Sequence, residues 1–280
     1  MMGYKLRTQV FRGLSFVLLA LVLVIVLFPI YWMLVTAFKP KMELYKPNPT
    51  LWPSNPTFEA ALHLFQRTPF FVQLRNSVLI SGVVTSVAIV ASSLAGYSIS
   101  RLRFPGRDFV ASSIFFTYLI PGTMTLIPLY VLMSNLGLLN SLYCLMLSFL
   151  SFTVPYSTWM LKGYFTSIPM ELEEAAMIDG CTRLGALARV VFPLAAPGVA
   201  AVGVYTFTMS WNQYLLPMLF NNKEELWTMP VALAGWIYGD VFMWGEIMSG
   251  ALIMSFPVLI LYFLGQRFLV AGLTAGAVKG

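Results

Sequence analysis

Long stretches without a single charged residue dominate this sequence. One runs from Gly13 to Phe38, about 26 residues, and another from Phe109 to Leu161, about 53 residues. A helix of about 20 apolar residues is enough to cross the hydrocarbon core of a bilayer. Only 10% of the residues are charged, against about a quarter in soluble domains, which is too few to solvate a folded surface of this size. The sequence therefore predicts an all-α integral membrane protein.

The charged residues divide the chain into six predicted membrane-spanning helices. The longest uncharged stretch is too long for one helix, and the turn-forming residues of segment 134–140 are expected to divide it. The predicted spans are residues 14–38, 76–100, 110–133, 141–161, 194–221 and 247–266. The first is interpreted as a span and not as a signal peptide, because its apolar stretch is long and no small-residue cleavage site follows it. Residues 1–280 are thus predicted to form a single transmembrane domain.

The distribution of lysine and arginine predicts that both termini are cytoplasmic. Cytoplasmic segments of membrane proteins carry an excess of these residues. With six spans, 11 basic residues fall on the side of the N-terminus and 6 on the other side, the latter being Lys39, Lys41, Lys46, Arg67, Arg75 and Lys223. The excess is reduced because the outer segment 39–75 is itself basic. That segment is rich in proline and then apolar from Phe58 to Phe65, which is typical of a short helix along the membrane face.

Nucleic-acid binding, metal binding and catalysis find no support in the sequence. The net charge is +6, but the basic residues lie in short connections between apolar stretches and not on one polar face, where phosphate-binding residues cluster. Cys144, Cys181 and His63 suggest neither a disulfide nor a metal site. The chain lacks H-E-x-x-H, G-x-S-x-G and G-x-x-x-x-G-K-[ST] motifs. We expect a non-catalytic chain with no metal and no bound cofactor, for which any ATP hydrolysis occurs in other subunits.

The predicted cytoplasmic segment 162–192 contains the signals for two short helices. Pro169 suits the first turn of a helix, where its missing N–H needs no partner. Three glutamates follow in that turn, where the helix dipole favours negative charge, namely Glu171, Glu173 and Glu174. Gly180 can end the helix in a left-handed conformation. The pattern predicts a helix of about ten residues, and a second one over residues 183–189 before Pro193 opens the next span.

The spacing of residues in this segment matches a known pattern. Glu174-Ala175-Ala176 is followed after three residues by Gly180, and after nine more by Val190-Val191-Phe192-Pro193. This resembles the EAA motif of ABC-importer permeases, E-A-A-x3-G-x9-I-x-L-P, with conservative changes at Val190 and Phe192. Three other stretches resemble the carbohydrate branch of that family and its MalG-like subunits, namely Arg103–Arg107 (RFPGR), Trp211-Asn212 and Gly272–Gly280 (GLTAGAVKG).

The resemblance implies a six-transmembrane-helix type I ABC importer permease in a bacterial or archaeal inner membrane. Such a chain would move a carbohydrate or related polyol into the cytoplasm. Its partners would be a second MalF-like permease subunit, two cytoplasmic ABC ATPase subunits that hold ATP and Mg, and an extracytoplasmic sugar-binding protein.

The same resemblance implies which residues of this chain meet those partners. The EAA motif would form the coupling helix that docks on the ATPase, through Glu174, Ala175, Ala176, Asp179, Gly180 and Pro193. The C-terminal tail would reach the ATPase interface through Thr274, Gly276 and Lys279. The segment 222–246 would extend toward the binding protein.

Two questions stay open at this point. Trp211, Asn212 and Gln213 are candidates for a solute path, but interhelical hydrogen bonding by the two amides, which is common between membrane helices, is the favoured interpretation. The alternative function is a secondary carrier or facilitator for small solutes. Proton- or sodium-coupled carriers usually need charged residues inside their spans, and the six predicted spans contain none, which favours the importer.

Overall fold

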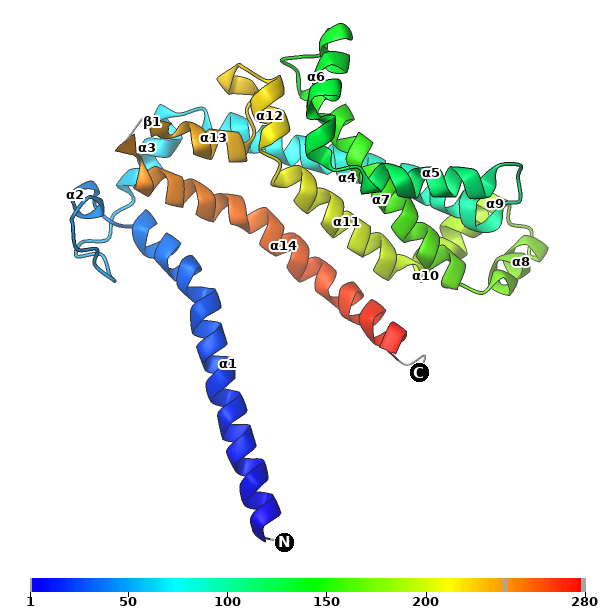
Figure 1. The fold of residues 1–280 in the computed structure, drawn as a ribbon, viewed down its shortest axis with the longest axis horizontal. Helices are drawn as coiled ribbons and strands as arrows, with labels where there is room; N and C mark the ends of the chain where they lie inside the picture. Colours follow the sequence, from blue (N-terminus) through cyan, green and yellow to red (C-terminus); the bar gives the residue numbers. More distant parts are fainter. Residues whose placement is uncertain (1, 239–240, 278–280) are drawn as a thin grey trace. The chain divides into compact units, whose positions relative to one another are not determined.

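The computed structural model describes residues 2–238 and 241–277, which form helices and one small sheet (Figure 1). The α-helices are α1 (Met2–Ala37), α2 (Lys41–Leu44), α3 (Glu59–Arg67), α4 (Phe70–Arg101), α5 (Arg107–Leu119), α6 (Leu126–Asn135), α7 (Leu142–Ser167), α8 (Met170–Ile178), α9 (Arg183–Ala186), α10 (Phe192–Leu194), α11 (Ala196–Trp211), α12 (Leu215–Phe220), α13 (Met229–Gly235) and α14 (Trp244–Ala277). Three further helical turns are η1 (Gly122–Thr125), η2 (Leu187–Val191) and η3 (Glu224–Leu226). Strands β1 (Ile237–Tyr238) and β2 (Val241–Phe242) pair antiparallel.

Four of these helices are long and apolar enough to cross a membrane by themselves. They are α1 over Phe11–Ala37, α4 over Phe70–Arg101, α7 over Leu142–Ser167 and α14 over Trp244–Phe268. Two pairs of helices meet the same criterion only together, Arg107–Leu119 with Gly122–Asn135 and Arg183–Leu194 with Ala196–Trp211. The described residues thus hold four to six candidate membrane spans, and the predicted all-α membrane fold is confirmed.

The third predicted span, residues 110–133, is two helices and not one. α5 ends at Leu119, Ile120 is extended (φ −70°, ψ 121°), and the second helix of the pair is bent by 93° from the first. The α conformation is disfavoured for a residue that precedes proline, so Pro121 ends α5. The expectation of a single helix over this range is therefore corrected.

The fifth predicted span, residues 194–221, is also interrupted. Ala195 (φ −84°, ψ 6°) separates α10 from α11, and Ala196–Trp211 is bent by 81° from the helical segment Arg183–Leu194. Pro197 has no N–H to donate to the carbonyl of Pro193, which interrupts the hydrogen-bond ladder at this point. A second break, at residues 212–214, separates α11 from α12. The range is thus made of three helical pieces.

The turn predicted at residues 134–140 is confirmed. α6 ends at Asn135 and α7 begins at Leu142. Between them Gly137 (φ +67°) and Asn140 (φ 55°) adopt the left-handed conformation that these two residue types tolerate best. The side chain of Asn140 accepts a hydrogen bond from the N–H of Asn222 (2.7 Å), so this turn is fixed to the end of α12.

Two compact units make up the chain, Met1–Thr68 with Gly235–Ser255, and Pro69–Ala234 with Phe256–Gly280. The first holds the predicted outer helix, α3. In its proline-rich segment, Glu43 accepts hydrogen bonds from the Thr50 hydroxyl and from the Ser54 N–H (3.1 Å) and hydroxyl (2.8 Å). These bonds, that from Thr50 most of all, lower the pKa of Glu43 to about 2, so its carboxylate stays ionised and holds the segment together at neutral pH.

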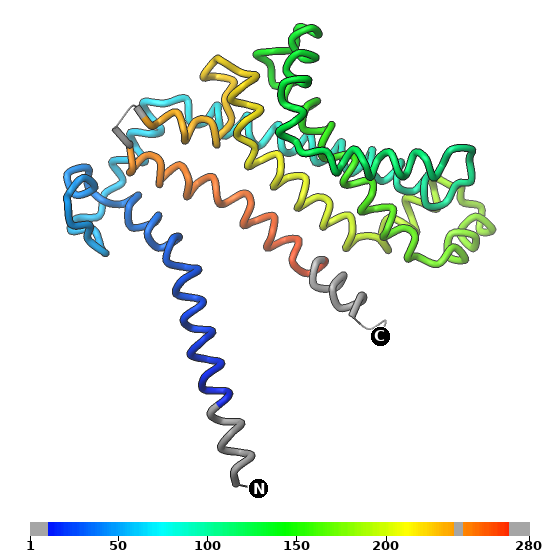
Figure 2. Tube along the Cα trace, viewed as in Figure 1, coloured from blue at the N-terminus to red at the C-terminus, as the bar shows by residue number. Residues whose placement is uncertain are grey.

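In the second unit, α4, α7 and α11 pack against one another (Figures 1 and 2). Two apolar clusters form between them, one with Ile80 and Leu145, and the other with Leu161, Phe165 and Val202. Helices α4 and α7 come very close at Gly96. A Cβ atom added there would lie 3.1 Å from the backbone nitrogen of Lys162 and 3.2 Å from the carbonyl oxygen of Thr158. Small residues allow this kind of close approach between membrane helices.

Gly96→Val is therefore expected to destabilise the second unit. The new side chain would press on the backbone of α7, and overpacking of this kind costs about 1–3 kcal/mol. Gly82→Val is the matched control, because Gly82 lies on the same helix with nothing within 4 Å of its Cβ position, and the substitution makes the same change in helix propensity and in backbone entropy. Thermal unfolding of both variants in detergent measures the difference. Equal melting temperatures would contradict the close contact at Gly96.

Candidate functional site

The helix predicted from Pro169 and Gly180 is present as α8. Pro169 (φ −56°, ψ 135°) precedes its first residue, Met170, and α8 ends at Ile178. Gly180 has φ +90°, as the left-handed ending requires. The N–H of Gly180 donates to the Met177 carbonyl (3.1 Å) and the N–H of Cys181 to that of Ala176 (3.0 Å), which satisfies carbonyl groups at the end of the helix.

A second short helix follows, also as predicted. Thr182 caps α9 by accepting a hydrogen bond from the N–H of Gly185 (3.1 Å). The chain then continues through η2, a π-helical turn that leads into α10. Leu187 and Val191 of this turn are buried in the same core as Phe165 of α7. Turns of this wider type are frequent at functional sites.

The glutamates of α8 differ in their exposure to solvent. Glu171 and Glu174 are exposed, whereas Glu173 is only 2% exposed. The Nε atom of Arg101 lies 3.1 Å from Oε2 of Glu173, and the hydroxyl of Tyr97 donates a hydrogen bond to Oε1.

Arg101 and Tyr97 are one turn apart on α4, so they face the same side of that helix. Arg101 also donates from Nη2 to the carbonyl of Ile168 (2.7 Å), just before α8. The buried group Tyr97–Arg101–Glu173 thus fastens α8 to the last turn of α4.

The sequence alone does not predict this buried ion pair. All three glutamates fit the helix-dipole argument equally well, and only Glu173 and Ala176 of α8 are buried. Their spacing of three residues marks one face of the helix, but nothing local says that the face is covered. The partners of Glu173 come from a helix far earlier in the chain, so its role depends on tertiary structure.

Most of the expected coupling residues lie on one exposed surface. We call it the α8–α9 surface; it consists of Leu172, Glu174, Ala175, Ile178, Asp179, Gly180 and Leu184. Ile178 is 86% and Leu184 65% exposed. Ala176 is buried and faces the rest of the second unit, and Pro193 is exposed on α10. Of the expected tail residues, Thr274 and Gly276 belong to α14, and Lys279 lies outside the described residues.

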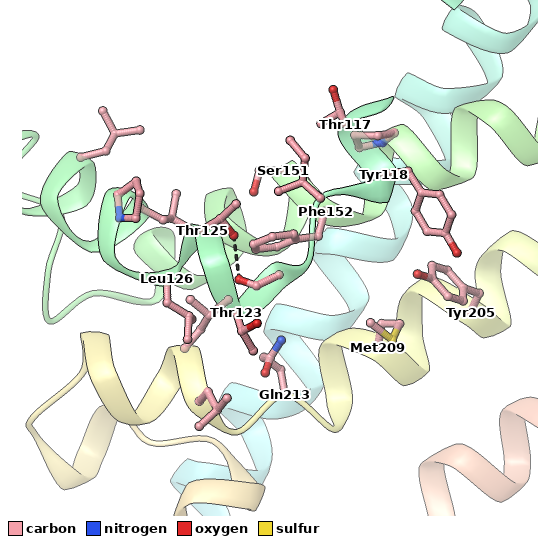
Figure 3. Close-up of a pocket in the computed structure, with 18 residues that line it drawn as sticks. Thr117, Tyr118, Thr123, Thr125, Leu126, Ser151, Phe152, Tyr205, Met209 and Gln213 are labelled. Carbon is pink, nitrogen blue, oxygen red and sulfur yellow. Dashed lines mark hydrogen bonds between the residues drawn. The ribbon is translucent and has the colours of Figure 1, made fainter. Parts of the chain in front are cut away.

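The three candidate solute-path residues have three different environments. Trp211 is buried and stacks on Phe207, with ring centroids 5.4 Å apart. Asn212 is exposed, and its amide donates to the carbonyl of Thr208 (3.0 Å) on its own helix, so this bond is not interhelical. Gln213 lines a cavity of about 600 Å³ in the second unit (Figure 3). Of the three, only Gln213 is placed to meet a solute there.

The sequence did not predict this cavity because six elements build its wall, including α12 through Leu215 and Leu216. Tyr118 comes from α5, Thr123 from η1, Leu126 from α6, Phe152 from α7 and Tyr205 from α11. None of the residues that line it is charged. Within residues 2–238 and 241–277, no group of three or more His, Cys, Asp or Glu side chains is placed to hold a metal ion.

Comparison with known proteins identifies the family. The family model described as "Binding-protein-dependent transport system inner membrane component" matches residues 88–275. The inner membrane ABC transporter permease protein YcjP of Escherichia coli is 39% identical over 264 residues, 94% of each chain. The sulfoquinovosyl glycerol transport system permease protein SmoH of Agrobacterium fabrum is 38% identical over 269 residues, 96% of this chain and 94% of SmoH.

A solved structure shows the same fold. The crystal structure of a bacterial ABC transporter involved in the import of the acidic polysaccharide alginate contains a chain that matches with a TM-score of 0.82 and 22% identity, over 92% of this chain and 96% of that one. Together with the family match over residues 88–275, this identifies the chain as a member of the binding-protein-dependent transport system inner membrane component family, a multi-pass permease that is the non-catalytic membrane subunit of an ABC importer.

Proposed function

We propose that this permease imports a carbohydrate or a related polyol into the cytoplasm. Two observations support this solute class: the C-terminal stretch Gly272–Gly280 resembles the carbohydrate branch of the family, and the relative SmoH is named for sulfoquinovosyl glycerol transport. Family membership also favours an importer over the alternative, a secondary carrier. We further propose six membrane crossings with both termini in the cytoplasm, the third made by the bent pair of α5 and α6 and the fifth by α11 and α12.

The proposed complex contains this chain, a second MalF-like permease subunit, two cytoplasmic ABC ATPase subunits and the extracytoplasmic binding protein. In it the α8–α9 surface docks on an ATPase subunit. The observation that carries this proposal is the exposure of apolar and acidic side chains on a short helix pair that is itself firmly attached, through the Arg101–Glu173 ion pair, to α4. A surface that transmits movement has to be both accessible and rigidly connected. The tail residues Thr274, Gly276 and Lys279 are proposed to reach the same partner.

Helix α4 is also attached at its other end. The side-chain amide of Asn76 donates to the carbonyls of Glu225 (2.8 Å) and Trp227 (3.1 Å), and Ser77 accepts from the N–H of Met229 (2.8 Å). These partners belong to the segment 222–246 that is proposed to approach the binding protein. With 32 residues, α4 is about 48 Å long at 1.5 Å per residue. One continuous helix therefore joins the proposed binding-protein side to the proposed ATPase side.

Docking can be tested by co-purification of a cognate ATPase subunit with the double variant Ile178→Ser, Leu184→Ser. Both side chains are exposed in the chain alone, and burying each in an interface would contribute about 1.5–3 kcal/mol. We expect the variant to retain the ATPase at least tenfold more weakly than the wild type. Met42→Ser is the control, since Met42 is 85% exposed on the proposed outer side. Equal retention in all three proteins would rule out docking through this surface.

A further inference from the structure

Two of the three breaks in the third and fifth predicted spans border the same cavity, namely those at residues 120–121 and 212–214. Ile120 at the first break lines it together with Gly122 and Thr123 just after, as does Gln213 at the second. Irregular backbone in the membrane is tolerated only where it is buried in protein or lines a cavity, because lipid offers no hydrogen bonds to the freed carbonyl and N–H groups. Interrupted membrane helices therefore point to solute-binding sites in transport proteins.

The wall of this cavity combines aromatic rings with uncharged polar groups. Tyr118 and Tyr205 line it, and Tyr156 packs between them with ring centroids 5.0 Å from Tyr118 and 3.9 Å from Tyr205. In Figure 3 the hydroxyl groups of Tyr118 and Tyr205 point toward one another from α5 and α11. Flat, rigid rings of this kind offer a surface for the apolar faces of sugar rings, and their hydroxyls offer hydrogen bonds to sugar hydroxyls.

Several polar groups of the wall are free to bind a solute. In the described part of the chain, the Gln213 amide, the Thr123 hydroxyl and the hydroxyls of Tyr118 and Tyr205 make no hydrogen bond to protein. Gln213 and Thr123 point toward the same part of the cavity in Figure 3. A volume of about 600 Å³ lies within the range of small-molecule sites, roughly 300–1,000 Å³.

We propose that this cavity is a saccharide subsite contributed by this chain, and that it accepts uncharged sugar units. An anionic sugar removed from water would need a cationic partner, and no lining residue is charged. Gln213 and Thr123 bind sugar hydroxyls, and Tyr118 and Tyr205 pack against the sugar ring. This inference rests on the proposed carbohydrate import and adds to it the place of contact and the charge class of the solute.

The test uses the assembled transporter in proteoliposomes with its binding protein. Gln213→Leu removes the amide at similar volume and is expected to lower sugar uptake about three- to tenfold, the effect of one or two lost hydrogen bonds. ATP hydrolysis stimulated by the liganded binding protein should change less than about twofold, which also shows that the variant folds and assembles. Gln66→Leu is the control, because Gln66 is an exposed glutamine that does not line the cavity. Unchanged uptake in both Gln213→Leu and Tyr118→Ala would overturn the subsite.

Occupancy and charge class are measured separately. In a Cys181→Ser background, Gln213→Cys should react with N-ethylmaleimide more slowly during transport of the sugar than without it, and equal rates would contradict occupancy. The uptake probes are trehalose, maltose and diacetylchitobiose as neutral sugars and sulfoquinovosyl glycerol as an anionic one. We expect a neutral probe to be transported; preference for the anionic probe would overturn the charge class alone. Uptake of none of the four would overturn the proposed function together with this subsite.

Discussion

Glu173→Ala is expected to lower ATP-driven uptake about a hundredfold or more and to destabilise the protein. The substitution leaves Arg101 buried, at 7% side-chain exposure, without its carboxylate partner. Breaking a buried ion pair by removing one member costs about 3–5 kcal/mol, and 1.4 kcal/mol corresponds to a factor of ten. α8 would then separate from α4, and movement of a docked ATPase would no longer reach the spans. Uptake per ATP hydrolysed and thermal unfolding are the two measurements.

Glu171→Ala and a double variant are the controls for this prediction. Glu171 lies on the same helix but is exposed, so its loss should leave uptake and stability nearly unchanged. Arg101→Met with Glu173→Leu removes both charges, and it should be more stable than either single change because no charge is left buried alone. If Glu173→Ala keeps the uptake of the wild type, the attachment of α8 to α4 does not carry the coupling.

Glu174→Ala should weaken binding of the ATPase while leaving the permease itself stable. Glu174 is exposed and makes no hydrogen bond or ion pair within the residues that the structure describes. An exposed glutamate of this kind contributes little to stability. In a docked, desolvated interface against a basic residue, however, its truncation would cost roughly 2–5 kcal/mol, which weakens association at least about thirtyfold. Titration of purified permease with the ATPase subunit measures that affinity.

Glu173 and Glu174 are adjacent in the sequence, but we expect one to stabilise the permease and the other to bind the ATPase. Glu173→Ala should lower the melting temperature of the permease alone, whereas Glu174→Ala should change only the affinity for the ATPase. Glu171→Ala is again the control for a general loss of acidic charge on α8. If Glu174→Ala and Glu171→Ala bind the ATPase as tightly as the wild type, ionic docking by Glu174 is wrong.

Local signals in the sequence were sufficient to predict helix α8. Pro169 and Gly180 predict where α8 begins and ends because their backbone preferences act within one turn. The turn at 134–140 was predictable for the same reason, since Gly137 and Asn140 supply its left-handed positions. Charge distribution was equally informative about the membrane class, because lipid excludes ionised groups from long stretches of chain.

Features that depend on distant partners were not predictable in this way. The break at residues 212–214 falls inside an uncharged stretch, where charge cannot mark an end. The break before Pro121 is different, because that proline is itself a local signal. The burial of Glu173 depends on Arg101, and the cavity depends on residues from six elements. These residues lie far apart in the sequence, and only the folded arrangement of the helices brings them together.

Reconstitution is the most direct test of the account that this chain is a permease driven by ATPase partners. Labelled sugar uptake is measured in liposomes that contain this chain, the second permease subunit and the ATPase subunits, with ATP on the cytoplasmic side and binding protein on the other. Parallel samples omit the ATPase subunits, the binding protein or ATP. We predict uptake only in the complete system; clear uptake of sugar by the chain alone, without ATPase subunits, would contradict the account.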